Sequence, residues 1–242
     1  MKNVILETQE EVNAFAGTSI EGDLFIDGSD IDDLSPLSTL TSVGGDLKIL
    51  FNPSLANLDG LSSLTFVGGT LCIEYNPTLT NLHGLSNLTS VGGNLVIEGN
   101  IIIPNLDGLN NLTSLGGVLI IHANIALTNI DGFGSLTSMG GDLVIQGNTA
   151  LTSINGFRSL TSLNFDLDVY DNVELKSVDG FRGLVSVAGD LNVYDNPSLT
   201  NLDGLSNLTS VGGDLLISGN PALNNLDSLS NLTEDKTRGE LN

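Results

Sequence analysis

Apolar residues alternate with other residues in short segments that return every 24 positions. In one such segment, Leu71 and Ile73 alternate with Cys72 and Glu74. A period of two is typical of a β-strand with one buried face. The first inward position is a leucine in eight successive segments: Leu47, Leu71, Leu95, Leu119, Leu143, Leu167, Leu191 and Leu215. The pattern predicts parallel strands stacked in one register.

A second apolar pattern, with a period of three, follows each strand. After residues 71–74 the apolar positions are Leu79, Leu82, Leu85, Leu88 and Val91. This period fits a compact 3₁₀-like or extended arc better than an α-helix. The pair Gly92-Gly93 comes next, and we expect a positive φ there to turn the chain back into the following strand.

The glycine pair and one asparagine define the repeat. The pair Gly44-Gly45 recurs at intervals of 24 residues, and the same frame holds Asn164-Phe165 in one copy and Ala188-Gly189 in another. A 24-residue period is too short for two helices with their turns and fits one coil of a β-solenoid. We expect one asparagine of each coil to hydrogen-bond the backbone at the same bend, as a ladder. The asparagines are Asn52, Asn76, Asn100, Asn124, Asn148, Asn172, Asn196 and Asn220.

The two ends of the chain depart from the repeat. Thr8 and Glu11 form a capping-box pattern, which predicts a short helix covering the first coil. We therefore divide the chain into an N-terminal cap (1–19), a single-domain solenoid (20–232) and a polar C-terminal tail (233–242). The predicted fold is a β-rich solenoid of eight to nine coils with a parallel sheet on one face.

The repeat resembles leucine-rich repeats of the receptor L-domain-like type. The unit LxIxxNPxLxxLxGLxxLxxVGG is matched at residues 191–197 and 215–221, and the registered copies span about residues 20–232. The leucine at Leu79 stands three positions after Asn76, a spacing that favours this variant over the familiar leucine-rich unit. The similar copies and acidic composition resemble bacterial surface repeats. The resemblance implies an extracellular or cell-surface protein.

The charge of the chain excludes several classes of partner. Its 242 residues include 29 Asp and Glu against 7 Lys and Arg, a net charge of −22. Nucleic-acid binding needs a basic stripe, so we expect no nucleic-acid partner. No apolar run is long enough to cross a bilayer, so we expect no membrane insertion. The first residues lack the apolar core of a signal peptide, so an export signal would lie outside this sequence.

Catalysis has little support. His83 and His122 lie at different positions of their coils, and no nucleophile motif surrounds either. Glu74 and Glu98 are expected to be outward neighbours, but an open sheet offers no cleft to raise the pKa of one of them. We therefore expect a protein that is not an enzyme and has no cofactor.

Rows of aspartate and threonine leave alternatives open. Asp46 and its equivalents precede the strands, where we expect their carboxylates to accept backbone hydrogen bonds. The alternative is that they bind calcium. We expect no metal site. A threonine row either orders water, as in ice-binding solenoids, or consists of β-favouring residues on an exposed arc. Its members are Thr41, Thr65, Thr89, Thr113, Thr137, Thr161 and Thr209.

The outward strand positions are where we expect function, because they change from coil to coil. One row reads Leu50, Glu74, Glu98, His122, Gln146, Tyr170, Tyr194 and Ser218, and the other reads Lys48, Cys72, Val96, Ile120, Val144, Asp168, Asn192 and Leu216. Such a face suits one irregular ligand better than a lattice such as ice. We predict a non-enzymatic extracellular binding or adhesion module for a protein or glycan. The alternatives are a structural spacer or adhesin stalk and, less favoured, an ice-binding protein.

Two patches of this face are the candidate sites. Stacked tyrosines beside carboxylates and amides suit a sugar or a cationic side chain. The predicted ligand-binding residues are Tyr170, Tyr194, Asp168, Asn192, Asp171, Asp195, His122 and Gln146. The second patch is an exposed apolar strip of Val96, Ile120 and Val144, a surface that fits self-association as a homodimer.

Overall fold

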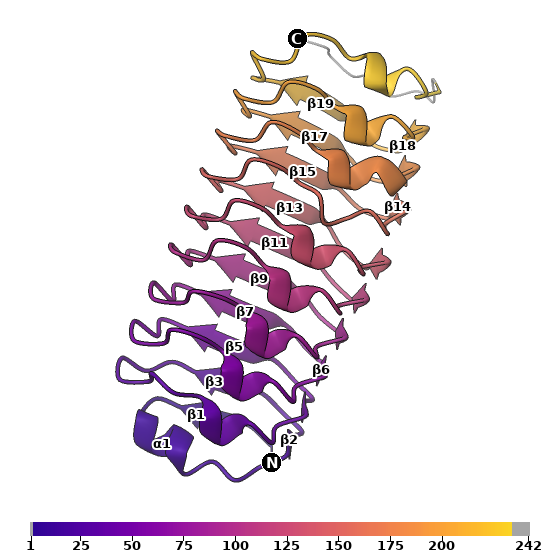
Figure 1. Ribbon diagram of the computed structural model, residues 1–242. Helices are drawn as coiled ribbons and strands as arrows, with labels where there is room; N and C mark the ends of the chain where they lie inside the picture. Colours follow the sequence, from indigo (N-terminus) through magenta and orange to yellow (C-terminus); the bar gives the residue numbers. More distant parts are fainter. Residues whose placement is uncertain (1, 234–242) are drawn as a thin grey trace.

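The computed structural model describes residues 2–233, which fold as a solenoid of stacked coils (Figure 1). A regular coil consists of a four-residue strand, a bend, a 3₁₀ helix and a two-residue strand. Equivalent residues of successive coils lie opposite one another in parallel register, as Leu71 does with Leu95. The predicted β-solenoid with a 24-residue coil is therefore confirmed.

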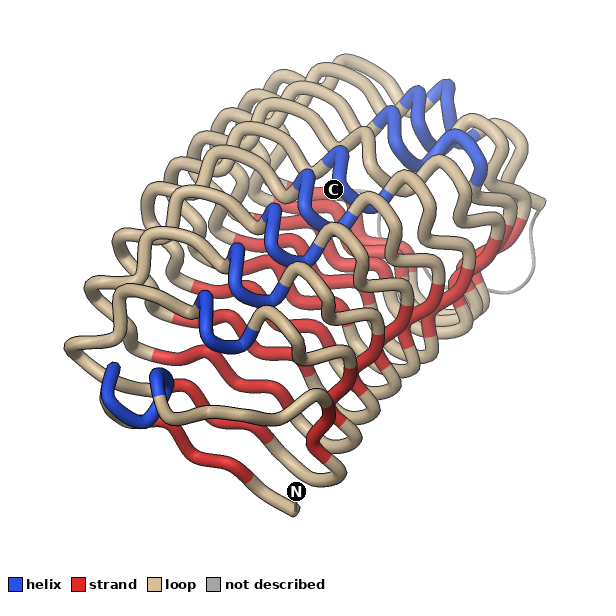
Figure 2. Tube along the Cα trace, turned by 60° about the horizontal axis from the view of Figure 1, so that its bottom comes forward, coloured by secondary structure: helices blue, strands red, loops and turns tan. Residues whose placement is uncertain are grey.

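Ten strands of the described residues form one parallel sheet along one side of the solenoid (Figure 2). Each inner strand pairs with the strands of the coils before and after it, so sheet order follows chain order. The strands are β1 (Val4–Leu6), β3 (Leu24–Ile26), β5 (Leu47–Leu50), β7 (Leu71–Glu74), β9 (Leu95–Glu98), β11 (Leu119–His122), β13 (Leu143–Gln146), β15 (Leu167–Tyr170), β17 (Leu191–Tyr194) and β19 (Leu215–Ser218).

Two-residue strands stack into two narrower sheets, one of six strands and one of three within residues 2–233. The break between them falls beside Asn164-Phe165, where the glycine pair is missing. The first sheet contains β2 (Ser19–Ile20), β4 (Ser42–Val43), β6 (Phe66–Val67), β8 (Ser90–Val91), β10 (Ser114–Leu115) and β12 (Ser138–Met139). The second contains β14 (Ser162–Leu163), β16 (Ser186–Val187) and β18 (Ser210–Val211).

Short 3₁₀ helices form a row on the side of the core opposite the main sheet (Figure 2). Leucines at every third position turn inward from this arc, and Leu79, Leu82, Leu85 and Leu88 are all buried. The predicted compact arc is confirmed. The helices are η1 (Ser35–Leu37), η2 (Asp59–Leu61), η3 (His83–Leu85), η4 (Asp107–Leu109), η5 (Asp131–Phe133), η6 (Asp179–Gly183), η7 (Asp203–Leu205) and η8 (Asp227–Leu229).

Three phenylalanines replace the arc leucine at one inward position. Phe133, Phe157 and Phe181 are buried and stack coil upon coil, with centroid separations of 5.3 Å and 5.5 Å. Their rings fill the core and take no part in the outer surface. These departures from the leucine repeat therefore serve the packing of the core.

The buried asparagines form the predicted ladder. The Nδ2 of Asn124 donates to the carbonyl oxygens of Ile97 and His122, at 2.9 Å and 3.0 Å. Its Oδ1 accepts from the backbone N–H of Asn100 at 3.1 Å. Each asparagine thus satisfies backbone groups at the bend that follows the strand, where no ladder partner is available.

The glycine pairs have a different role from the one expected. Positive φ occurs directly after the strands, at Tyr75 (54°), Gly99 (66°) and their equivalents, and not at Gly92 or Gly93. A Cβ at Gly92 would lie 2.2 Å from the carbonyl oxygen of Gly68 in the preceding coil. The pairs are therefore favoured because stacked backbones approach closely there, and the prediction of positive φ is wrong.

The N-terminal segment contains a helix and a strand. Thr8 caps the N-terminus of helix α1 (Gln9–Asn13). Its hydroxyl accepts from the Glu11 N–H at 3.3 Å, and the Glu11 carboxylate accepts from the Thr8 N–H at 3.1 Å. The predicted capping helix is confirmed. Strand β1 was not expected, and it adds one strand to the main sheet by pairing with β3. Of the expected polar tail, residues 234–242 lie outside the described residues.

Candidate functional site

The outward side chains of the main sheet form two rows that run along the solenoid. In β15, Asp168 and Tyr170 point outward while Leu167 and Val169 are buried. Parallel register places each outward residue beside its equivalent in the next coil, for example Tyr170 beside Tyr194. The alternation of the strand therefore separates a uniform core face from a variable outer face.

The two tyrosines stack face to face. The ring centroids of Tyr170 and Tyr194 lie 4.6 Å apart and the rings are inclined by 11°. The hydroxyl of Tyr170 donates to the Oε1 of Gln146 at 2.8 Å. Both rings are partly buried by their neighbours, and this desolvation is the main reason that the pKa of each phenol is raised. The pair is a preorganised aromatic surface in which the hydroxyl of Tyr170 is held in place.

A carboxylate and an amide lie beside the tyrosines in the neighbouring row. Asn192 Nδ2 donates to Asp168 Oδ1 at 2.8 Å. Burial raises the pKa of Asp168, and this effect outweighs the opposite effect of the hydrogen bond from Asn192. Nearby carboxylates, with Asp166 first among them, raise it further. A half-buried carboxylate surrounded by others favours a cationic or hydrogen-bond-donating ligand group.

Asp171 and Asp195 directly follow the two tyrosine strands. They are exposed and have positive φ values of 58° and 53°. Aspartate tolerates this left-handed conformation better than most residues. The structure therefore places both carboxylates at one edge of the tyrosine pair, where a ligand can reach them.

The other two predicted residues extend the same outward row. His122 lies opposite Gln146, and Gln146 lies opposite Tyr170. On its other side, the Nδ1 of His122 is 3.6 Å from the Oε1 of Glu98. The eight predicted ligand-binding residues are thus brought together as one continuous patch over β11, β13, β15 and β17, which we call the tyrosine patch.

The predicted apolar strip is continuous but half-buried rather than exposed. Ile120 lies opposite both Val96 and Val144, and neighbouring side chains cover part of each. Cys72, in the same row, is 8% exposed, and burial raises its pKa to about 12. Close stacking of the coils explains this burial. The proposed role of Val96, Ile120 and Val144 in a homodimer stays a prediction, which sedimentation over a concentration series tests.

The sequence pattern did not predict one exposed pair of aromatic residues, Phe51 and Tyr75. Phe51 and Tyr75 are 55% and 42% exposed, and their rings stack with centroids 5.2 Å apart and an inclination of 2°. They occupy the positive-φ position after the strand, where bulky residues are rare. Other coils have Gly99, Ala123 or an aspartate there, so no repeated residue type marked the position.

The aspartate and threonine rows bind the backbone of neighbouring coils. The Oδ1 of Asp166 accepts from the N–H of Asp190 at 2.7 Å. The hydroxyl of Thr113 donates to the carbonyl oxygen of Thr89 at 3.1 Å. The carboxylates of the aspartate row thus accept backbone hydrogen bonds, as expected. The hydroxyl protons of the threonine row are donated to backbone carbonyls, whereas an ice-binding face would offer them to water. Within residues 2–233, no three His, Cys, Asp or Glu side chains form a group that could hold a metal ion.

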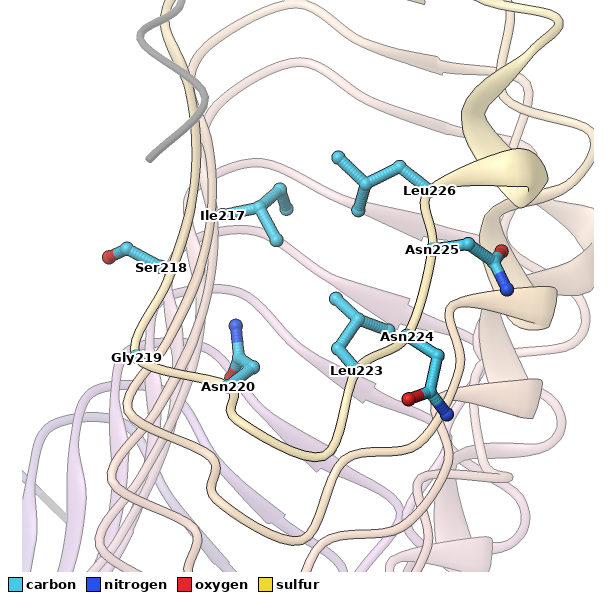
Figure 3. Close-up of a pocket in the computed structure, with 8 residues that line it drawn as sticks. All are labelled: Ile217, Ser218, Gly219, Asn220, Leu223, Asn224, Asn225 and Leu226. Atoms are coloured by element: carbon cyan, nitrogen blue, oxygen red, sulfur yellow. The ribbon is translucent and has the colours of Figure 1, made fainter.

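The last described coil leaves a hollow of about 310 Å³ (Figure 3). Ile217, Leu223 and Leu226 line it with apolar side chains, and Asn220 lies at its bend. These are inward positions of the repeat, so the hollow is the end of the core and not part of the outward face.

The 24-residue coils in parallel register define a β-solenoid. One similar solved structure is that of an internalin, InlF, from Listeria monocytogenes, with 15% identity, 97% of this chain and 89% of that chain covered, and a TM-score of 0.33. No protein-family profile and no curated protein matches the chain. Among the described residues, none of the helices has the length and apolar character needed to span a membrane.

Proposed function

We propose that this protein is a non-enzymatic binding module that recognises a protein or glycan ligand with the tyrosine patch. The observation that carries the proposal is the stacked pair of Tyr170 and Tyr194 on the variable outer face. Aromatic rings bind sugars and cationic side chains through their faces and edges. The carboxylates of Asp168 and Asp171 supply hydrogen-bond acceptors next to the rings.

The contrast between the two sides of the sheet supports binding over a purely structural role. Inward positions repeat as leucine, isoleucine or valine, whereas the equivalents of Tyr170 range from His122 to Ser218. A spacer needs the uniform core alone. The variable row adds a different group in each coil, which fits a ligand that lacks translational symmetry.

The proposed setting is extracellular or at the cell surface. The support is the resemblance of the repeat to surface leucine-rich repeats, together with an exposed surface rich in carboxylates. A net charge of −22 keeps such a protein soluble and repels other anionic surfaces.

The test is a screen of the full chain against immobilised glycans and extracellular protein domains. We expect saturable binding to one ligand class. A variant with Tyr170→Ala and Tyr194→Ala run in parallel should lose that signal while keeping its thermal transition. Absence of saturable binding on both arrays would contradict the binding proposal and favour the spacer.

A further inference from the structure

A separate hollow lies at the N-terminal end of the outer face, formed by the first three strands of the main sheet. It has a volume of about 230 Å³ and is lined by Ile5, Glu7, Phe25, Asp27, Lys48 and Leu50. In the main sheet, Phe25 lies opposite both Ile5 and Lys48. The hollow is therefore built from outward positions, unlike the hollow at the end of the core.

The walls of the hollow combine apolar surface with two free acids. Ile5 is 60% exposed, and Phe25 and Leu50 are partly exposed. Glu7 and Asp27 are exposed, and within residues 2–233 neither carboxylate takes part in an ion pair or a side-chain hydrogen bond. The hollow thus offers an apolar bed with negative charge at its edge.

A cationic group of the chain already lies against the apolar wall of the hollow. The Nζ of Lys48 lies 5.4 Å from the centroid of the Phe25 ring. The same ammonium is 3.4 Å from Asp46, which neutralises it. A cation over an aromatic face is a favourable arrangement that strengthens when water is excluded. Because Lys48 is already paired, the charge left at the hollow is that of Glu7 and Asp27.

We propose that this hollow binds a lysine or arginine side chain presented by a protein partner. The alkyl stem packs on Ile5, Phe25 and Leu50, and the cationic head reaches the carboxylates of Glu7 and Asp27. Long basic side chains bury their stems on apolar surface while their charged ends remain at its rim. The net charge of −22 attracts a basic partner and speeds its association.

This site is independent of the tyrosine patch. Leu50 and Tyr170 lie in the same outward row, five coils apart, which is roughly 24 Å at the spacing of neighbouring strands. A partner that binds the hollow need not contact the tyrosine patch. Absence of binding at one of the two sites therefore leaves the proposal for the other site intact.

The experiment is a titration of the ¹⁵N-labelled full chain followed by NMR. The probes are Nα-acetyl-arginine amide and the corresponding citrulline amide, which has nearly the same shape without the charge. We expect the arginine probe to shift the amide signals of Phe25, Asp27 and Leu50, and the citrulline probe to bind about fivefold more weakly or not at all. N-Acetylglucosamine serves as a neutral sugar probe and should leave these signals in place.

Matched variants separate a specific site from general attraction to an acidic protein. Glu7→Gln with Asp27→Asn should weaken binding of the arginine probe about fivefold or more. Asp131→Asn with Glu174→Gln removes the same charge at exposed carboxylates outside both sites and should leave binding unchanged. The proposal is overturned if both pairs weaken binding equally, if citrulline binds as well as arginine, or if only the sugar shifts these signals.

Discussion

Asn100 receives two hydrogen bonds from Asn76 of the preceding coil. Its Oδ1 accepts from the backbone N–H of Asn76 at 3.2 Å and from the side-chain Nδ2 of Asn76 at 3.3 Å. The Nδ2 of Asn76 in turn donates to two carbonyl oxygens, that of Ile49 in the preceding coil and that of Glu74 in its own coil. A side chain with both a donor and an acceptor is needed to bond on both sides, which explains the asparagine in eight successive coils.

Removal of one ladder member should strongly destabilise the solenoid. Asn124→Ala leaves the buried carbonyl of Ile97 and the N–H of Asn100 without their partners, so we expect a loss of about 2–4 kcal/mol in the free energy of unfolding. Urea denaturation measures it. The control is Asn111→Ala, which removes one exposed bond to Ser86 and should cost under about 1 kcal/mol. Equal losses in the two variants would show that the ladder has no special role.

The close approach of the coils disfavours a side chain at the glycine pairs that are stacked on one another. A Cβ at Gly116 would lie 2.0 Å from the carbonyl oxygen of Gly92, so Gly116→Ala should lower the free energy of unfolding by about 1–3 kcal/mol. At Gly134, where φ is −59° and the nearest atom would be 3.7 Å away, alanine should be neutral or slightly stabilising. Thermal melts compare the two. A melting temperature of Gly116→Ala at or above that of Gly134→Ala would refute the stacking argument.

Asp168 should make stability depend on pH in an unusual direction. Its folded-state pKa is raised, mainly by burial, so the folded protein favours the protonated carboxyl. The stability that this group contributes is full below its unfolded pKa and is lost as pH rises through the folded pKa. Asp168→Asn should therefore melt higher than the wild type at pH 7, and the difference should shrink on acidification. A difference that stays constant between pH 7 and pH 3 would contradict the raised pKa.

Cys72 should be an unreactive thiol in the folded protein. Burial raises its pKa to about 12, with Glu74 as the next contribution. Relative to an ordinary cysteine, this shift alone lowers the thiolate fraction at pH 8 by about a thousandfold. Labelling with Ellman's reagent should be slow in buffer and rapid in urea. Rapid labelling of the native chain would mean that the thiol is exposed.

Much of the architecture follows from the sequence because stacking imposes the same constraint on every coil. Leu71 and Asn76 recur in register, so the strand, the core and the ladder are predictable from their period. Strand β1 lies outside that frame, and its three residues carry no repeat signal. The sequence correctly placed a glycine pair before each strand, but the expected positive φ was the wrong explanation. The close approach of two stacked backbones cannot be deduced from the sequence pattern of one coil.

The site is less predictable because its residues are the ones that vary. Tyr170 and Tyr194 could be found, since both occupy the same strand position in adjacent coils. Phe51 and Tyr75 could not, because their position follows the strand and most coils have small or acidic residues there. The extent of burial at Cys72 depends on the sizes of side chains in neighbouring coils, which only the packed structure reveals.

The most direct test of the binding proposal is the dissociation constant of the best ligand found by the array screen. We compare Tyr170→Ala with Tyr194→Ala against Phe66→Ala with Phe165→Ala, which removes two exposed aromatic rings outside the main sheet. Loss of the tyrosine pair should weaken binding by about a hundredfold, as expected for aromatic residues at the centre of an interface, with the melting temperature nearly unchanged. Loss of the two phenylalanines should change it less than about threefold. An unchanged dissociation constant in the tyrosine variant would contradict the assignment of the ligand to the tyrosine patch.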